Sequence, residues 1–319
     1  MCECSLRCDL GVIDFCVEYC GQTEKLIKLY QEHRVIATTL VCPTCNSEAR
    51  VDFRRKAWRC DKTYIANKKK RRPCNYFQSL YKGTWLSNAK LDLETNIKFV
   101  QLYLRENFTL KNTIAELHLS DKTVVDWCSF MREVFIEWSQ KHSRRLGGIS
   151  EDNIPLTVEL DESKCGKRKY NKGRRIEGQW VFGGYCRETK DIFMVPVEKR
   201  DSKTLVKLVI EYVKPGTTIL TDCWRAYNIL GKKGFKHLTV NHSINFVDPI
   251  TGVHTNNIER TWRDVKNWLP KFGRKKVHFT GYLARVIFLK KYPEPNKRLH
   301  HFLLAAADLY PPYQPPHTL

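Results

Sequence analysis

The stretch that decides the fold is residues 156–161, which read LTVELD and alternate apolar with polar side chains as a half-buried strand does. Two more β-rich runs follow at residues 179–186 and 191–197, and three consecutive strands of this kind can form a meander. The elements expected after them are a helix at 202–213, a strand at 217–222, a short helix at 225–230, a strand at 237–240 and a helix at 255–269. This order predicts a mixed α/β domain over residues 156–292.

Three acidic residues fall where this order of elements would bring them together. Asp161 ends the first expected strand, Asp222 ends the fourth, and Glu259 lies in the first turn of the last helix. Carboxylates at adjacent strand ends can share Mg²⁺ or Mn²⁺, because both ions prefer oxygen ligands. Two such ions about 3.5–4 Å apart suit an in-line phosphoryl displacement. We therefore predict that these three acids are catalytic and hold two metal ions.

The competing interpretation of these acids is solvated surface charge, because the chain has 34 Asp and Glu residues from which any three can be chosen. Their context sets these three apart without deciding between the two interpretations, since Asp222 follows the apolar residues Ile219 and Leu220, which need no charge after them. Glu162 would point to the opposite face of a continuing strand. We therefore do not expect Glu162 to be a ligand.

The cysteines of the first 75 residues predict a structural zinc site. The chain has 13 cysteines, and an odd number with no evident secretory signal argues against a full disulfide framework. Cys42 and Cys45 form a CxxC pair, and Cys60 and Cys74 complete four thiolate ligands in a zinc ribbon expected over residues 41–86. The alternative is a set of free thiols near a chance CxxC. No metal is expected at the earlier cysteines, which are Cys2, Cys4, Cys8, Cys16 and Cys20.

Residues 87–138 have helical periodicity and predict a helix-turn-helix. Ser120 is a good N-cap, and Asp121 suits the positive end of the helix that follows. In a DNA-reading module of this layout, residues 121–135 would be the recognition helix and Lys122 a DNA contact. The alternative is a plain helical hairpin that serves as a spacer. The remaining segments are interpreted as a helical lead-in (1–40), a polar linker (139–155) and a C-terminal tail (293–319).

The net charge of +21, from 55 Lys and Arg against 34 Asp and Glu, predicts a polyanionic partner. A hydrophobic fraction of 42% excludes a mainly disordered chain. No apolar run approaches the ~18 residues of a membrane span, so no membrane association is expected. Two basic segments are expected to contact the DNA backbone, with nuclear import or a solvated loop as the alternative for the second. They comprise Lys68, Lys69, Lys70, Arg71 and Arg72 in the ribbon, and Lys164, Lys167, Arg168, Lys169, Lys172, Arg174 and Arg175 after Asp161.

Three motifs resemble the DDE transposases of the Merlin superfamily, eukaryotic relatives of bacterial insertion-sequence transposases with an ISXO2-like domain. They read TDCWRAY at 221–227, VNHSINFV at 240–247 and HTNNIERTW at 254–262. The similarity covers residues 41–292, and the order of strands and helices is similar to that of a ribonuclease-H-like domain. The 36 residues between Asp222 and Glu259 agree with the eukaryotic branch. The long spacing between Cys60 and Cys74 departs from the family pattern.

This resemblance implies an enzyme that binds the terminal inverted repeats of its element. It would cleave DNA at the element ends and join the 3′-hydroxyls to target DNA. Joining two ends implies at least two active sites, so we expect a homodimer or a larger assembly, and we expect it in the nucleus. The alternatives are a domesticated, non-catalytic DNA-binding protein derived from a transposase and a structure-selective nuclease. The presence of all three acids favours the transposase over a pure binder.

Several other residues are expected beside the site. His242 and His254 could contact phosphate or orient a water, or they could form hydrogen bonds within their loop. Asn257 is expected to support the neighbouring Glu259. Trp224 and Trp262 are expected to pack beneath the acids rather than against bases.

Overall fold

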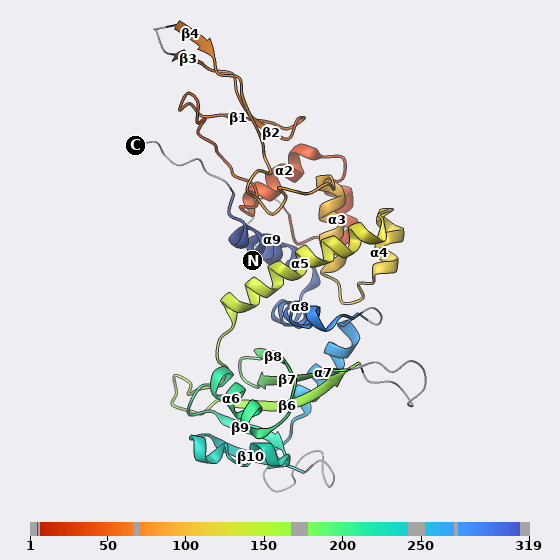
Figure 1. Cartoon of the computed structure of the whole chain (residues 1–319), viewed down its shortest axis with the longest axis vertical. Coiled ribbons are helices and arrows are strands. Elements are labelled where there is room, and N and C mark those ends of the chain that lie inside the picture. Colours follow the sequence, from red (N-terminus) through yellow and green to blue (C-terminus); the bar gives the residue numbers. More distant parts are fainter. Residues whose placement is uncertain are drawn as a thin grey trace. The chain divides into compact units, whose positions relative to one another are not determined.

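The computed structural model describes residues 5, 7–66, 70–166, 178–241, 253–270 and 274–312. The chain forms two units (Figure 1). Unit 1 comprises residues 1–138 and 292–319, and unit 2 comprises residues 139–291. No helix in these described ranges is long and apolar enough to cross a membrane.

A five-stranded sheet forms the centre of unit 2, in the order β10-β9-β6-β7-β8 (Figure 1). β7 lies antiparallel to β6 and β8, whereas β9 runs parallel to β6 and β10. The strands are β6 (Thr157–Cys165), β7 (Gln179–Cys186), β8 (Ile192–Val197), β9 (Thr218–Asp222) and β10 (Lys236–Val240). The first three strands form the expected meander, and the mixed α/β class is confirmed.

Helices cover both faces of this sheet. Successive strand residues point to opposite sides, and apolar strand residues on each side pack against a helix. On one face, Val158 and Leu160 of β6 share a hydrophobic core with α6 (Ser202–Tyr212). On the other face, α7 (Asn256–Trp268) and α8 (Phe279–Lys291) pack around Val181 and Met194. The alternate residues of β6, which include Asp161, therefore face α7.

β6 continues to Cys165, past the strand expected at 156–161, and this corrects the expected position of Asp161. Asp161 lies in the middle of a strand rather than at its end. The reason is the antiparallel pairing with β7, in which Glu162 lies opposite Phe182 and the ladder holds the backbone beyond Asp161. Asp222 is the last residue of its strand, as predicted.

Unit 1 contains a three-stranded sheet and a separate strand pair. β1 (Arg50–Asp52), β2 (Ala57–Cys60) and β5 (Tyr76–Ser79) form the sheet in the order β1-β2-β5. β3 (Thr63–Ala66) and β4 (Lys70–Pro73) pair antiparallel with each other. The segment expected as a basic finger is therefore built on two paired strands.

Three helices follow the ribbon, namely α3 (Leu93–Tyr103), α4 (Leu110–Leu117) and α5 (Asp121–His142). His118, with a φ of 51°, ends α4 in the left-handed conformation. Ser120 Oγ then accepts a 3.2 Å hydrogen bond from the Thr123 amide at the start of α5, as predicted for an N-cap. Helix, turn and helix therefore succeed one another in the expected order, and α5 runs beyond residue 135.

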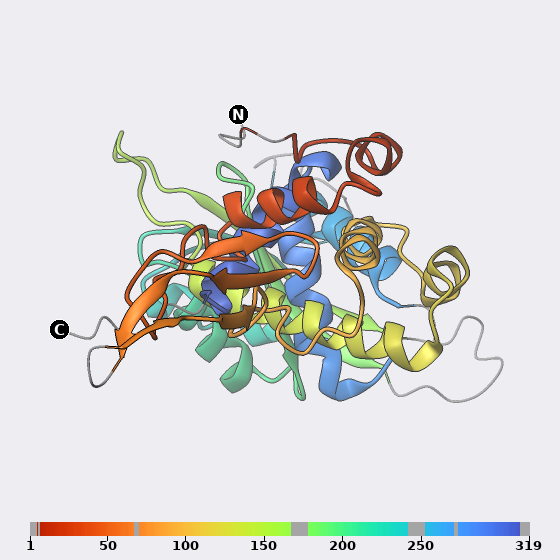
Figure 2. The ribbon, with the colours of Figure 1, turned by 90° about the horizontal axis from the view of Figure 1, so that it is seen from above.

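The segment expected as a C-terminal tail, residues 293–319, instead contains α9 (Arg298–Leu309). Its apolar residues recur at helical spacing and are buried, namely Leu299, Phe302, Leu303 and Ala306. α1 (Val12–Tyr19) and α2 (Thr23–Glu32) form the start of the same unit. α9 lies beside the end of α2 in both views (Figure 1 and Figure 2), so unit 1 joins the two ends of the chain.

Candidate active site and cysteine cluster

The three predicted acids come from three elements of unit 2. Asp161 lies in β6, Asp222 ends the neighbouring β9, and Glu259 lies in the first turn of α7. Glu159 of β6 is level with Leu220 of the parallel strand β9. Two residues further along each strand, Asp161 and Asp222 point to the same side of the sheet. The sheet therefore makes these two aspartates neighbours.

The carboxyl of Asp161 has a strongly perturbed pKa. Burial, together with the negative charges of Glu162 and Asp222, raises the pKa of Asp161 to about 7. A hydrogen bond of 2.9 Å from Trp262 Nε1 to Asp161 Oδ2 opposes this increase. Two neighbouring, half-buried acids fit a divalent cation, because its charge would offset both partial burial and mutual repulsion.

Glu259 lies on the helix that carries Trp262, about one turn before it. Its Oε1 accepts a 3.4 Å hydrogen bond from Thr255 Oγ1. The three acids do not form a group of ligand atoms within 4.8 Å of one another. In the described part of the chain, the groups that meet this criterion lie in unit 1. The structure thus places Asp161 and Asp222 as neighbours, and Glu259 lies three residues before the tryptophan that contacts Asp161.

A glycine lets Trp262 lie against Asp161. Gly183 of β7 is the partner of Asp161 across the two strands. A Cβ atom on Gly183 would lie 2.7 Å from Trp262 Cη2, closer than real side chains pack. Trp262 is buried as expected, whereas Trp224 is 43% exposed. The prediction that Trp224 packs beneath the acids is therefore wrong, and Arg200 instead lies over its ring at 5.1 Å.

Glu159 is a buried carboxylate that the sequence interpretation missed, and it holds the start of α7. Its Oε2 accepts hydrogen bonds from the backbone amides of Asn257 (2.9 Å) and Ile258 (3.0 Å). Thr255, the N-cap residue, makes no side-chain cap of its own. A side chain of β6 therefore caps the helix that carries Glu259 and places negative charge at its positive end.

Arg187 balances the charge of Glu159 and connects it to the loop before α7. Its Nε donates to Glu159 Oε1 at 2.7 Å, and its Nη2 donates to the His254 carbonyl at 2.7 Å. The same Nη2 lies 3.0 Å from His254 Nδ1, so His254 takes part in loop hydrogen bonding, one of its two expected roles. Asn257 Nδ2 donates to Glu159 Oε1 at 2.7 Å, so the Asn257 side chain helps to hold the start of α7 against Glu159. His242 lies outside the described residues.

Glu162 points to the other face of the sheet, as expected for the residue after Asp161. The Tyr227 hydroxyl donates a hydrogen bond to Glu162 Oε1, and Arg200 Nη1 lies 3.8 Å from Oε2. Burial, together with the charge of Asp222, raises the pKa of Glu162. The charge of Glu162 in turn contributes to the raised pKa of Asp161 from the other side of the sheet.

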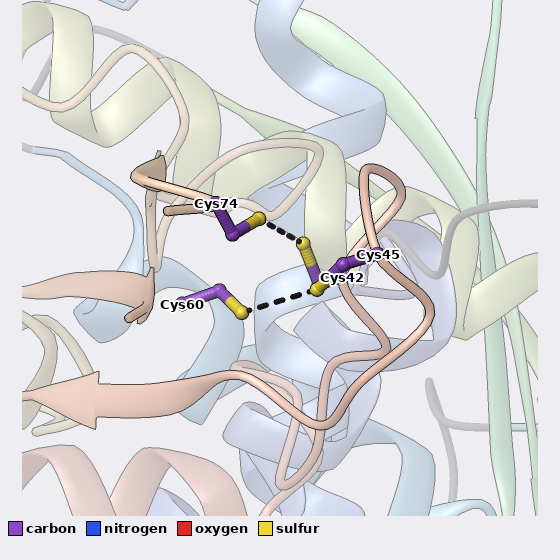
Figure 3. A group of neighbouring side chains, drawn as sticks. All are labelled: Cys42, Cys45, Cys60 and Cys74. Carbon is purple, nitrogen blue, oxygen red and sulfur yellow. Dashed lines mark hydrogen bonds between the residues drawn. The ribbon is translucent and has the colours of Figure 1, made fainter. Parts of the chain in front are cut away.

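The four predicted cysteine ligands converge in unit 1 (Figure 3). Cys42 Sγ lies 3.3 Å from Cys74 Sγ, and Cys45 Sγ lies 3.4 Å from Cys60 Sγ. Tetrahedral Zn–S bonds of about 2.3 Å place the sulfurs about 3.8 Å apart. The cluster could therefore hold zinc after a small expansion.

The long spacing between Cys60 and Cys74 is absorbed by β3 and β4. Thr63 pairs with Pro73 at the base of these antiparallel strands. The Cys74 amide also donates to the Lys62 carbonyl at 2.7 Å. The inserted segment therefore leaves and returns at one place, which brings Cys74 back to the cluster.

The cations predicted to contact DNA are described only in part. Arg71 and Arg72 are exposed on β4, and Lys122 is exposed in the first turn of α5. Lys164 of β6 has its Nζ 5.6 Å from the centre of the Trp180 ring. The side chain of Lys70 is not described, and the others lie outside the described residues, namely Lys68, Lys69, Lys167, Arg168, Lys169, Lys172, Arg174 and Arg175.

Comparisons with known proteins agree on one class of protein. Residues 146–289 match the family model described as the ISXO2-like transposase domain, which covers the sheet and helices around the acids. A relative from Haemophilus influenzae, named an uncharacterized transposase-like protein, is 36% identical over 93 residues. That alignment covers 29% of this chain and 74% of the relative.

Proposed function

Because this chain belongs to the family of transposases with an ISXO2-like domain, we propose that it is a DDE-type DNA transposase. It binds the terminal inverted repeats of its element, cleaves DNA at the element ends and joins the 3′-hydroxyls to target DNA. The observation that carries this proposal is the half-buried Asp161, raised in pKa to about 7 beside Asp222, within the region that matches the family.

Unit 2 is a ribonuclease-H-like domain in this proposal. Its support is the sheet order β10-β9-β6-β7-β8, in which β7 alone runs against the other four strands. Helices on both faces of the sheet are the second support. The central strand β6 then carries Asp161, and its parallel neighbour β9 carries Asp222.

Asp161, Asp222 and Glu259 would hold two Mg²⁺ or Mn²⁺ ions in this enzyme. Such ions, when bound, activate a water molecule and offset the charge that develops on the phosphodiester. The chain supplies the placement, because the sheet fixes the two aspartates and Trp262 orients Asp161 through a 2.9 Å hydrogen bond. Glu159 fixes the start of the helix that brings Glu259.

The DNA-reading parts of the proposed enzyme lie in unit 1. Cys42, Cys45, Cys60 and Cys74 hold one structural zinc ion. The helix-turn-helix formed by α4 and α5 exposes Lys122 at the start of the recognition helix. The complex that joins two element ends contains at least two copies of the chain, and its location in the nucleus stays a prediction.

The test is a strand-transfer assay with Mg²⁺ or Mn²⁺ and duplexes that end in the inverted repeats of the element. We expect the wild-type protein to give joined product, and Asp161→Asn and Glu259→Gln to bind the duplex without joining it. Asp264→Asn is the matched control, because Asp264 lies on the same helix but pairs with Lys290. Binding without cleavage by the wild type under either metal would contradict the enzyme and favour a domesticated DNA-binding protein.

A further inference from the structure

A second cluster of metal-ligand side chains lies in unit 1, apart from the four cysteines of the ribbon. It consists of Cys8, which precedes α1, His33, which follows α2, and His300 in the first turn of α9. His33 Nε2 lies 3.0 Å from His300 Nδ1, and Cys8 Sγ lies 3.8 Å from that same nitrogen. All three ligand atoms lie within 4.8 Å of one another. Three segments distant in the sequence thus meet at one point.

Two of the distances in this cluster are close to those of a tetrahedral metal site. Zn–N bonds of about 2.0–2.1 Å and Zn–S bonds of about 2.3 Å place two nitrogens about 3.3 Å apart, and a nitrogen and a sulfur about 3.6 Å apart. The observed separations of 3.0 and 3.8 Å differ from these values by a few tenths of an ångström. The sulfurs of the ribbon differ from their tetrahedral separation by a similar amount.

The hydrogen bond at Nδ1 of His33 leaves its other ring nitrogen, Nε2, able to bind a metal ion. His33 Nδ1 lies 2.8 Å from the Leu29 carbonyl oxygen, which can only accept, so Nδ1 carries the proton. In the neutral ring the Nε2 lone pair then points at the cluster. Metal-binding histidines commonly donate their second N–H to a backbone carbonyl in this way.

The burial of the ligands suits a structural rather than an exposed site. Cys8 is 1% exposed and His33 is fully buried. His300 is partly exposed, so a water molecule can complete the shell on its side. A thiolate and two imidazoles are the donor set that zinc selects.

We propose that Cys8, His33 and His300 bind a second zinc ion. The ion ties the segment before α1, the end of α2 and the C-terminal helix α9 into one body within unit 1. Cys8 and His300 are 292 residues apart, so this ion cross-links the two ends of the chain. The proposal changes the expectation of no metal at Cys8, and it does not depend on the catalytic role of unit 2.

The first test is the zinc content of the full-length protein after loading with zinc and removal of the excess. We expect two zinc ions per chain in the wild type, and one in each of Cys8→Ser, His300→Ala and Cys42→Ser. The double variant of Cys8→Ser with Cys42→Ser should hold none. His301→Ala is the matched control, because His301 stacks on Tyr292 and lies outside the cluster, so this variant should keep two.

A single zinc ion in the wild type that disappears in Cys42→Ser would overturn the proposal. It would mean that His33 and His300 simply share a hydrogen bond. Zinc X-ray absorption of the wild type tests the same proposal without variants, so it does not depend on whether a variant folds. A first shell of sulfur mixed with nitrogen or oxygen, in a ratio of five sulfurs to three lighter atoms over both clusters, supports the second site. A shell of sulfur alone contradicts it.

Discussion

The cysteine cluster of unit 1 and the acidic site of unit 2 are two candidate metal sites that differ in how close together their ligand atoms lie. The four cysteine sulfurs lie within 4.8 Å of one another, whereas the three carboxylates do not form such a group in the described residues. Thiols can approach as neutral groups, but carboxylates repel one another unless a cation lies between them. We therefore propose that the fold alone brings the ligands of the first site together, and that those of the second come together only when its ions bind.

The two sites also differ in what positions their ligands. The cysteines follow short turns and strand ends, such as Cys60 at the end of β2. The acids depend on an interaction across the unit, since Glu159 of β6 caps α7 at Asn257 and Ile258. We therefore expect disruption of the cysteine cluster to unfold a region, and disruption around the acids to displace a single helix.

Loss of the ribbon zinc should have the largest effect. The binding free energy of a structural zinc site is about 10–16 kcal/mol and contributes directly to folding. We expect Cys60→Ser to lose hydrogen-exchange protection in β1, β2 and β5 and to bind the inverted repeats weakly, while the strands of unit 2 keep their protection. Cys223→Ser is the control, because Cys223 is exposed. Full protection of β2 in Cys60→Ser would show that the ribbon folds without metal.

The Glu159→Gln substitution should have the next largest effect. The amide leaves Arg187 without its carboxylate partner, and breaking a buried ion pair costs about 3–5 kcal/mol. We expect faster hydrogen exchange at residues 256–260, and strand transfer reduced more strongly than DNA binding. Glu198→Gln removes a carboxylate from an exposed pair with Lys276 and serves as the control. Unchanged exchange at the start of α7 would exclude the capping role of Glu159.

The Gly183→Ala substitution should have the smallest effect of the three. The new methyl group would lie 2.7 Å from Trp262 Cη2, so the indole must shift away from Asp161. Overpacking of this kind costs about 1–3 kcal/mol. We expect a lower melting temperature and a change in tryptophan fluorescence. Gly231→Ala is the matched control, since a Cβ there meets no atom within 4 Å. Equal melting temperatures and equal fluorescence of the two variants would mean that Trp262 is not held against the sheet.

Much of the sheet in unit 2 could be predicted from the sequence, because alternation and apolar runs reflect burial on strands. Residues 179–186 were expected as a strand and are β7 with the same bounds. The extension of β6 past Asp161 could not be predicted, because it depends on pairing with Phe182 and its neighbours on β7. The helix α9 was not expected in the tail, although the apolar residues of 298–309 recur at helical spacing.

The candidate site could be predicted only where its residues have a local signal in the sequence. The spacing and motifs predict Asp161, Asp222 and Glu259 as candidate ligands, and of the two expected at strand ends only Asp222 lies at one. The role of Glu159 was not predictable, because its partners on α7 lie 98 and 99 residues away. Cys8, His33 and His300 were missed for the same reason, since His33 and His300 are 267 residues apart and form no short-spaced motif.

Manganese binding to the full-length protein is the most direct measurement of the acidic site. Electron paramagnetic resonance can follow free Mn²⁺ during titration of zinc-loaded protein bound to an inverted-repeat duplex. We expect two Mn²⁺ ions per chain in the wild type, and an affinity at least about tenfold weaker in Asp161→Asn, because loss of a charged oxygen ligand weakens binding of a hard cation. Equal Mn²⁺ affinity in the wild type and Asp161→Asn would contradict a metal site at Asp161 and Asp222.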